Sequence, residues 1–549
     1  MMHHAPMTPV RTIAFTGFIA AVACGGGGGP SADDSFGGGM MTTTGAAGDT
    51  GTADVPTDPG TTSADASSSS AASSSSTGDA PPECAGDDDC IGHPDGPLCS
   101  SGQCTTMCAA GTTQPCYTGA NGTLDVGPCK RGTRTCSDDG ASWGACEGEV
   151  VPAGADACGN AVDDDCNGTV DDDLDLDGDG WGACAGDCCD ADGGACFDAA
   201  SVNPGAVEYV GNDVDDDCDG DIDEVATACD AGLASDAGDP LDYARALDLC
   251  SFTELDPADP KDRTWGVIAA KLSLANGAGV PAAQSRAIRP GFGTVLKPFQ
   301  GERLAVFSSG HAADLNDQAP PYAPFEGGQD MKTSSPPPAD WLAANGGKLP
   351  NPVGCVAPAV PAANDPVMLT LTIRAPTNAK SFSAKMYFFS AEYPEYVCTA
   401  FNDFFVALVD STNATNPADG NIAIYDDGIT QWPVGVNILE AANGLFTQCS
   451  NGAISQCGLG GAYAGCTATN ELSGTGFDTM GATLQSCGYN GRYGGGTGWL
   501  QMSGNVTPGE VMTLRFAIWD TSDGIYDSLV LLDDFQWSVD ASEPGVQPG

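Results

Sequence analysis

Alternating apolar and polar positions dominate the C-terminal half of the chain and predict β-strands. In two segments every second residue is apolar: 367–376 (Val367, Leu369, Leu371, Ile373) and 511–520 (Leu514, Phe516, Ile518). Further strands are expected at 303–310, 381–390, 403–410, 421–428 and 528–537, with loops rich in Gly, Pro and Asn between them. The predicted fold class is therefore mainly β, with an antiparallel β-sandwich of jelly-roll type over residues 240–541.

The first 240 residues lack this pattern, and their composition changes several times. Residues 24–82 are mostly Gly, Ser, Thr, Ala and Asp, which cannot bury enough surface to offset the cost of ordering, so we expect a disordered tether. Residues 83–146 hold nine cysteines and hardly any aliphatic run, so disulfides must replace the missing core. Residues 147–230 form an acidic module. Several modules on one chain are expected for 549 residues.

The N-terminus predicts export. Residues 1–23 contain Arg11 and then an apolar stretch too short to span a membrane, which is typical of a signal peptide; translation could start at Met1 or Met7. The ending AAVAC resembles the lipobox of bacterial lipoproteins, although Ala21 stands where Leu is usual. This resemblance implies lipidation of Cys24 and an outer-membrane lipoprotein at the cell surface, with the membrane as a partner through the lipid. The alternative is ordinary cleavage that leaves Cys24 as a free thiol.

The number of cysteines and the net charge indicate the compartment and limit the kinds of partner. Twenty-five cysteines indicate an oxidising compartment, and lipidation of Cys24 would leave an even number for disulfides, whose connectivity the sequence leaves open. A formal net charge of −55 excludes nucleic acid as a natural partner, because phosphate binding needs clustered Lys and Arg. Cations or neutral ligands fit better.

An internal repeat carries the strongest chemical signal. Residues 159–171 (GNAVDDDCNGTVD) align with residues 211–223 (GNDVDDDCDGDID) at an offset of 52. Each copy has oxygen side chains at alternating positions and then a glycine, as in positions one, three, five and six of a calcium loop. These are Asp163, Asp165, Asn167 and Gly168, and Asp215, Asp217, Asp219 and Gly220. Position nine is also acidic, Asp171 or Asp223, but position twelve is Leu174 or Ala226, so Asp173 or Glu224 would have to substitute for the usual Glu.

A third loop is predicted between the copies, where Asp175, Asp177 and Asp179 precede Gly180. Its twelfth position is Gly186, one residue before Asp187. Residues 160–224 contain twenty Asp, two Glu and no Lys or Arg. Two carboxylates about 4 Å apart repel by about 4 kcal/mol at an effective dielectric constant near 20, so compaction without cations would be costly. The alternative is that these runs are only a solvated surface.

The repeat unit resembles the metal-binding motif named after the copper protein MopE, with a pattern close to DxDNDCDGxVDE. Residues 163–171 and 215–224 match most of it, while Val210 stands where its first cysteine is usual. Cys166 and Cys218 occupy position four, where the side chain should point away from an ion and can form a disulfide. Copper prefers imidazole and sulfur donors, and residues 147–230 contain no His or Met, so calcium is the expected cofactor and copper the lesser alternative.

Part of the predicted sandwich resembles the choice-of-anchor L family of bacterial surface proteins. The resemblance rests on FFSAEYPEYVCTAFNDFFVALVD (388–410), GGGTGWL and DTSDGIYDSLVLLDDFQW, with Ala391 where a Glu is common. It implies an exported β-rich domain and no particular activity. Oxygen side chains near Pro394 predict a second metal site, with Asp527 as a further ligand: Glu392, Glu395, Asn402, Asp403 and Asp527. Asp520, Asp523, Asp527 and Asp533 form a second acidic set; alternatively, all these groups only cap turns.

We expect no enzyme, because His93 and His311, the two histidines after the signal peptide, belong to no recognisable catalytic motif. The predicted function is a surface lipoprotein in which calcium-bound repeats stiffen a stalk that presents the sandwich for adhesion or for binding an extracellular protein or glycan. One alternative is a metal-sequestering, copper-type surface protein. Another is an extracellular hydrolase that pairs Glu392 with Glu395 or Asp527.

Overall fold

The computed structural model of the chain describes only part of its residues. These are Cys84, Cys90, 98–100, 103–105, 107–193, 196–327, 329–351, 355–394, 396–426, 431–437, 445–450, 454–455, 462–463, 466, 468–480 and 492–549. The predicted signal peptide, the lipidation site Cys24 and the tether lie outside the described residues, as do His93 and Glu395. Among the described helices none has the length and hydropathy needed to cross a membrane.

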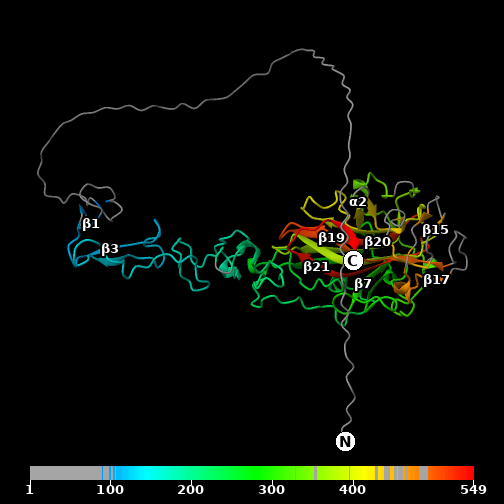
Figure 1. The fold of residues 1–549 in the computed structure, drawn as a ribbon, viewed down its shortest axis with the longest axis horizontal. Coiled ribbons are helices and arrows are strands. Elements are labelled where there is room, and N and C mark those ends of the chain that lie inside the picture. Colours follow the sequence, from blue (N-terminus) through cyan, green and yellow to red (C-terminus); the bar gives the residue numbers. More distant parts are fainter. Residues whose placement is uncertain are drawn as a thin grey trace, which may run out of the picture. The chain divides into compact units, whose positions relative to one another are not determined.

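The described elements confirm the predicted mainly β fold class (Figure 1). The long strands are β5 (Gly266–Ser273), β9 (Ala363–Arg374), β10 (Ser381–Ser390), β11 (Phe404–Asp410), β19 (Gly495–Asn505), β20 (Val511–Asp520) and β21 (Ser528–Ser538). The shorter strands are β1 (Leu98–Ser100), β2 (Gln103–Thr105), β3 (Thr113–Cys116), β4 (Gly132–Thr135), β6 (Arg286–Arg289), β7 (Leu304–Ser308), β8 (Ser334–Ser335), β12 (Ile424–Asp426), β13 (Gln431–Pro433), β14 (Gln448–Cys449), β15 (Ile454–Ser455), β16 (Ala462–Tyr463), β17 (Thr479–Met480), β18 (Arg492–Tyr493) and β22 (Gly545–Pro548). The α-helices are α1 (Pro240–Arg245) and α2 (Ala339–Ala344). The 3-10 helices are η2 (Ala183–Ala185), η3 (Ala199–Ser201), η4 (Pro260–Asp262), η5 (Ala283–Ser285), η6 (Phe325–Gly327) and η8 (Asn470–Leu472).

Two antiparallel sheets form the sandwich. The larger sheet has the order β14-β19-β10-β21-β7-β6, with β22 also paired to β19. The smaller sheet has the order β11-β20-β9-β5, with β8 paired to the end of β9. Figure 1 shows β7, β19, β20 and β21 gathered in one body. The antiparallel sandwich predicted from the alternating pattern is thus confirmed.

The main core lies between the two sheets. The predicted apolar face of β9, which includes Val367, Leu369 and Leu371, packs in this core with β10, β20 and β21. The opposite face of β9 is covered too, because Met368 packs with Trp341 of α2. Helix α1 begins where the sandwich was predicted to start: Pro240 occupies its first turn and the Asp239 carboxylate accepts a hydrogen bond from the Leu241 amide.

Strands β5, β6, β19 and β22 of the two sheets were not predicted. Residues 495–505 are rich in glycine, and Gly495 and Gly496 pack directly under the rings of Phe446 and Tyr387, so aromatic side chains from neighbouring segments supply the apolar surface that β19 lacks. The tail beyond the predicted domain end at 541 forms β22, whose Val546 is fully buried against the core.

Disulfides replace regular structure in residues 84–230, as predicted. Cys90 is disulfide-bonded, and the pairs in which both side chains are described are Cys84–Cys99, Cys108–Cys136, Cys116–Cys146, Cys129–Cys166, Cys158–Cys184, Cys188–Cys218, Cys189–Cys196 and Cys229–Cys250, with Cys355–Cys398 and Cys449–Cys466 in the sandwich. The two position-four cysteines, Cys166 and Cys218, are both paired, as expected for side chains that point away from the loop centre.

Hydrogen bonds join the acidic repeats to the sandwich. The Asn203 side-chain amide donates to Asp179 of the third predicted loop at 2.7 Å, and its oxygen accepts from the Thr377 hydroxyl at 2.7 Å. Asn378, next in the β9–β10 turn, bonds to both the amide and the carbonyl of Val207. The third loop therefore lies one side chain away from the sandwich.

Candidate cation-binding sites

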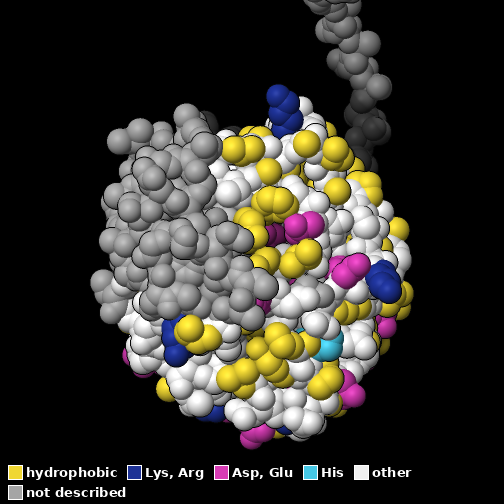
Figure 2. Space-filling model, turned by 90° about the vertical axis from the view of Figure 1, so that its right-hand side faces the viewer, with side chains coloured by type: hydrophobic (Ala, Val, Ile, Leu, Met, Phe, Trp, Pro, Cys, Tyr) yellow, Lys and Arg dark blue, Asp and Glu magenta, His cyan; other side chains and the backbone are white. Residues whose placement is uncertain are grey.

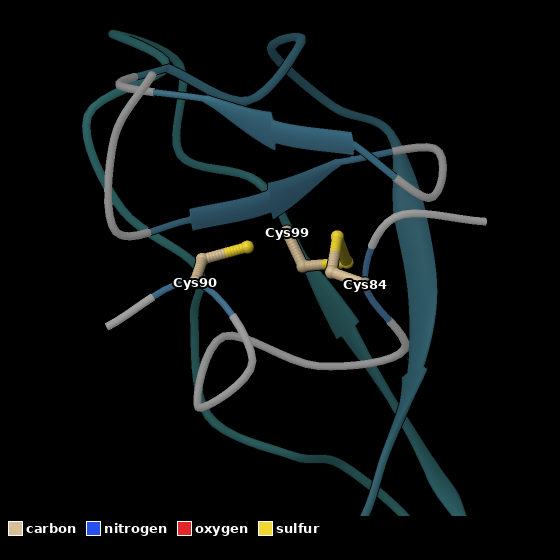
Figure 3. A group of neighbouring side chains, drawn as sticks. All are labelled: Cys84, Cys90 and Cys99. Atoms are coloured by element: carbon tan, nitrogen blue, oxygen red, sulfur yellow. A yellow bond between two sulfur atoms is a disulfide. The ribbon is translucent and has the colours of Figure 1, made fainter. Parts of the chain in front are cut away.

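A sulfur cluster in the Cys-rich module is not a metal site. Cys84, Cys90 and Cys99 lie together, as Figure 3 shows. Cys84 and Cys99 form a disulfide and Cys90 is also disulfide-bonded, so none of the three offers a thiolate to a metal.

The three predicted loops share one set of internal hydrogen bonds. The position-one carboxylate accepts from the backbone amide of the glycine at position six, at 3.0 to 3.1 Å, in Asp163, Asp175 and Asp215. The position-three carboxylate accepts from the amide of position five, at 3.0 to 3.3 Å, in Asp165, Asp177 and Asp217. The three loops thus have the same local conformation, in the registers predicted from the sequence.

Further carboxylates join the position-three acids of the first two loops; Glu224 was among the predicted ligands, whereas Asp156, Asp172 and Glu208 were not. One carboxylate oxygen from each of Asp156, Asp165 and Asp172 lies within 4.8 Å of the others; we call this group the first triad. The second triad consists of Glu208, Asp217 and Glu224 and meets the same limit. Each member of the second triad follows its counterpart by 52 residues (156 to 208, 165 to 217, 172 to 224), so the repeat reproduces the whole group.

The two triads also share an unbonded oxygen. Asp172 Oδ1 and Glu224 Oε2 are buried and have no hydrogen-bond partner among the described residues. Burial raises the pKa of Asp217 to about 6, and the charges of Asp219 and Glu224 add to the rise. Burial likewise raises the pKa of Glu208 to about 7. Asp156 and Glu208 each accept two backbone amides, so the oxygens that a hard cation would satisfy are the unbonded ones of Asp172 and Glu224.

In the third loop Asp187 supplies the carboxylate that is missing at position twelve, where the residue is Gly186. One oxygen from each of Asp177, Asp179 and Asp187 lies within 4.8 Å of the others; we call this the third triad, and Asp190 approaches Asp175 and Asp177 in the same way. Asp187 Oδ2 and Asp177 Oδ2 are buried without a partner in the described part of the chain. Burial raises the pKa of Asp187 to about 7, and Asp179 and Asp177 add to this rise.

Other predicted ligands hold the backbone instead. Asp171 accepts hydrogen bonds from the amides of Asn160 and Ala161, and Asp223 accepts from those of Gly211 and Asn212. The Asn167 side-chain amide lies between two carboxylates, donating to Asp165 and Asp172 at 2.9 Å each. Asp219 accepts from the Asp221 amide. The signal that points to Asp156 and Glu208 is their own 52-residue spacing.

A second acidic group lies inside the sandwich, where four strand ends meet. Its members, here called the buried carboxylate cluster, are Glu392, Asp403, Asp520 and Asp527. Asp403 precedes β11 and Asp520 ends β20, next to the pair Phe404 and Trp519. Glu392 follows β10 and Asp527 precedes β21. Both residues lie just beyond the antiparallel pair Ser390 and Ser528. The first two acids therefore come from the smaller sheet and the other two from the larger.

Burial and mutual repulsion raise the pKa values of the carboxyl groups in this cluster. All four carboxylates are at most 1% exposed. Burial raises the pKa of Asp520 well above its usual range, and Asp403 and Asp527 add to the rise. Burial also raises the pKa of Glu392, with Asp403 and Asp520 contributing, and brings that of Asp403 to about 7. Asp403 is anchored by hydrogen bonds, because it accepts from the Ser528 hydroxyl at 2.6 Å and the Thr521 amide at 3.1 Å.

The remaining predicted residues of the second site have other positions. The Asn402 amide oxygen accepts from the Asn437 backbone at 2.9 Å, so it fixes the loop before β11. Asp523 is half-buried and accepts from the Ile525 amide. Asp520, which the sequence grouped only loosely with these residues, belongs to the cluster. Glu392, which the hydrolase alternative pairs with Glu395 or Asp527, is 1% exposed.

Asp533 lies apart from the cluster and provides a pH test. Burial raises its pKa to about 8, with Asp248 and Asp534 adding to the rise although the Phe299 amide donates to it. The folded state then binds this proton more tightly than the unfolded chain, whose Asp pKa is about 3.9. The contribution of Asp533 to the free energy of unfolding is fully present below about pH 4. It is lost as the pH rises through about 8, and the free energy of unfolding falls by up to about 1.4 kcal/mol per pH unit. Asp533→Asn should remove that loss.

Denaturant unfolding of both proteins at pH 5 and pH 8 measures this effect. We expect the variant to gain stability relative to the wild type at pH 8. An equal pH dependence for the two proteins would contradict the assignment.

Comparison with known proteins identifies part of the sandwich. No curated protein and no solved structure matches the chain. Residues 362–536, which carry all four members of the buried carboxylate cluster, match the family model of the Choice-of-anchor L domain, and this match indicates a bacterial surface-associated protein.

Proposed function

We propose that this chain is a surface lipoprotein whose acidic repeats bind calcium and thereby stiffen the connection to a ligand-binding β-sandwich. The observation that carries the proposal is the recurrence of a complete carboxylate triad at a 52-residue spacing. A solvated acidic surface would have no reason to bring equivalent side chains within 4.8 Å in both copies, because their repulsion favours separation.

The donor chemistry supports calcium. Each triad consists of carboxylates alone, and these hard oxygen donors suit calcium or magnesium, whereas copper prefers nitrogen and sulfur ligands. Copper sequestration therefore has no donor set among the triads. Without cations the triads would repel; with them the loops would close and hold Asn203 against the sandwich.

The sandwich is the part that would meet a ligand. Figure 2 shows one face of the molecule, on the side where β15 and β17 lie in Figure 1, with apolar side chains gathered among a few charged ones. Contiguous apolar patches on a protein surface mark interaction sites. The apolar side chains on this face therefore support adhesion or binding to an extracellular protein or glycan as the role of the sandwich.

Limited proteolysis on intact cells tests the proposal. With calcium, the segment 107–227 should resist cleavage; with EDTA, protease should cut within 107–227, and reducing electrophoresis separates the fragments that the disulfides of this segment hold together. Cys24→Ser should release the whole chain in both conditions, because the lipid anchor is lost. Equal cleavage with calcium and EDTA would contradict the calcium-stiffened connection, and retention of the Cys24→Ser protein on the membrane would contradict the anchor.

A further inference from the structure

We propose that the sandwich itself holds a buried calcium ion between its two sheets, coordinated by the carboxylates of Glu392, Asp403, Asp520 and Asp527. This site is separate from the acidic repeats and does not depend on the function proposed for them.

Unpartnered oxygen atoms carry the inference. Both oxygens of Asp520 and both of Asp527 lack a hydrogen-bond partner among the described residues, as do Glu392 Oε2 and the Thr521 hydroxyl. Ser309 lies near Asp520 and the Gln329 amide near Asp527, but neither meets the geometry of a hydrogen bond; the Asp403 carboxylate, itself an acceptor, also lies beside Asp520. The Ser309 hydroxyl instead bonds to the Ser528 main chain. Buried polar groups in folded proteins are nearly always satisfied, so a ligand is expected here.

No basic side chain neutralises the cluster. The ion pairs in the described part of the chain involve Asp242, Asp259, Asp317, Asp340 and Asp478, and none involves a member of the cluster. Gly310 lets the Asp527 carboxylate lie directly against the backbone, because a Cβ at this position would overlap Asp527 Oδ2. A buried group of like charges with no counter-charge from the protein calls for a cation.

The donor set selects the type of cation. Six buried oxygen atoms lack partners, and calcium takes six to eight oxygen ligands, often with carboxylates binding through both atoms. The cluster contains neither imidazole nor thiolate, the donors that copper and zinc prefer.

The ion would tie the sheets together at one end of the sandwich. Asp403 and Asp520 belong to the smaller sheet, and Glu392 and Asp527 adjoin the larger one. A single ion in contact with both pairs would turn their repulsion into a link across the core. Calcium would then stabilise the sandwich even in a chain whose repeats bind none.

Thermal unfolding of the full chain tests the site with calcium chloride or EDTA as the probe. At calcium one hundredfold above Kd, the wild type should gain about 5–10 °C in Tm. Asp520→Asn with Asp527→Asn should abolish the part of this gain that comes from the sandwich and raise the Tm in EDTA above that of the wild type, because two buried charges are removed. The control Asp314→Asn changes a buried acid whose oxygens are already bonded to the Gly293 and Asn316 amides, and it should keep the full calcium response. A calcium response unchanged in the double variant would overturn the proposal.

A second measurement leaves the buried cluster intact. A chain carrying Asp165→Asn, Asp177→Asn and Asp217→Asn lacks a member of each triad, and after dialysis against a low calcium concentration its bound metal can be counted by elemental analysis. We expect about one equivalent of calcium to remain, whether or not the repeats of the wild type bind the ion. The absence of bound calcium would overturn the buried site even if the double variant fails to fold.

Discussion

Replacing Asp165 and Asp217 together by asparagine is expected to lower the calcium affinity of the first and second triads by about a hundredfold or more. Each is the position-three carboxylate of its loop, and each meets two other acids within 4.8 Å. Affinity in oxygen-ligand loops follows the number of charged ligands, so the loss of one carboxylate per site has a large effect. Asparagine keeps the oxygen that accepts the position-five amide, so the loop conformation should survive.

Calorimetric titration of the full chain measures the change. The matched control is Asp213→Asn with Asp221→Asn, which removes two exposed carboxylates outside the triads. This control removes the same number of negative charges and should leave the calcium affinity within about twofold of the wild type. If both double variants weakened binding equally, the effect would come from general charge and the triads would not be discrete sites.

Loss of the Cys129–Cys166 disulfide should have the second large effect. Its two cysteines are almost fully buried and close a loop with a sequence separation of 37, for which the chain-entropy model gives a stabilisation of about 4 kcal/mol. Cys166 is also position four of the first loop, so the bond fixes Asp165 on one side and Asn167 on the other. Replacing both cysteines by alanine should therefore destabilise residues 107–227 and weaken calcium binding by the first triad.

A disulfide whose cysteines lie outside the calcium loops distinguishes the loss of stability from the loss of calcium affinity. Replacing Cys108 and Cys136 by alanine removes a bond with a sequence separation of 28 inside the Cys-rich module. Stability should fall by a similar amount, measured by denaturant unfolding, while calcium affinity should stay close to that of the wild type. Equal calcium affinities in the two disulfide variants would contradict the positioning role of Cys166.

The sequence predicts the sandwich well because alternation reports directly on burial. β10 and β20 have the predicted bounds, 381–390 and 511–520. β19 was not predicted, because the apolar side chains that cover it, Phe446 and Tyr387, come from elsewhere in the chain and no local pattern reveals them.

In the candidate sites, too, some ligands follow from local sequence and others depend on residues that are distant in the chain. The loop positions follow from local spacing, so Asp165, Asp177 and Asp217 were predicted. Asp156 and Glu208 precede their loops, and only folding brings them to the triads. Asp520 and Asp403 meet through strand register across β11 and β20, and register depends on tertiary packing rather than on local sequence.

Calcium titration of an oxidised fragment spanning residues 107–227 tests the central claim most directly. These bounds enclose both partners of six disulfides, whereas a cut at residue 147 would leave Cys166 without Cys129. Calorimetry and circular dichroism should show saturable binding of two or three calcium ions with a gain of structure, and weaker binding of magnesium and copper. No calcium binding, or a preference for copper, would contradict the account.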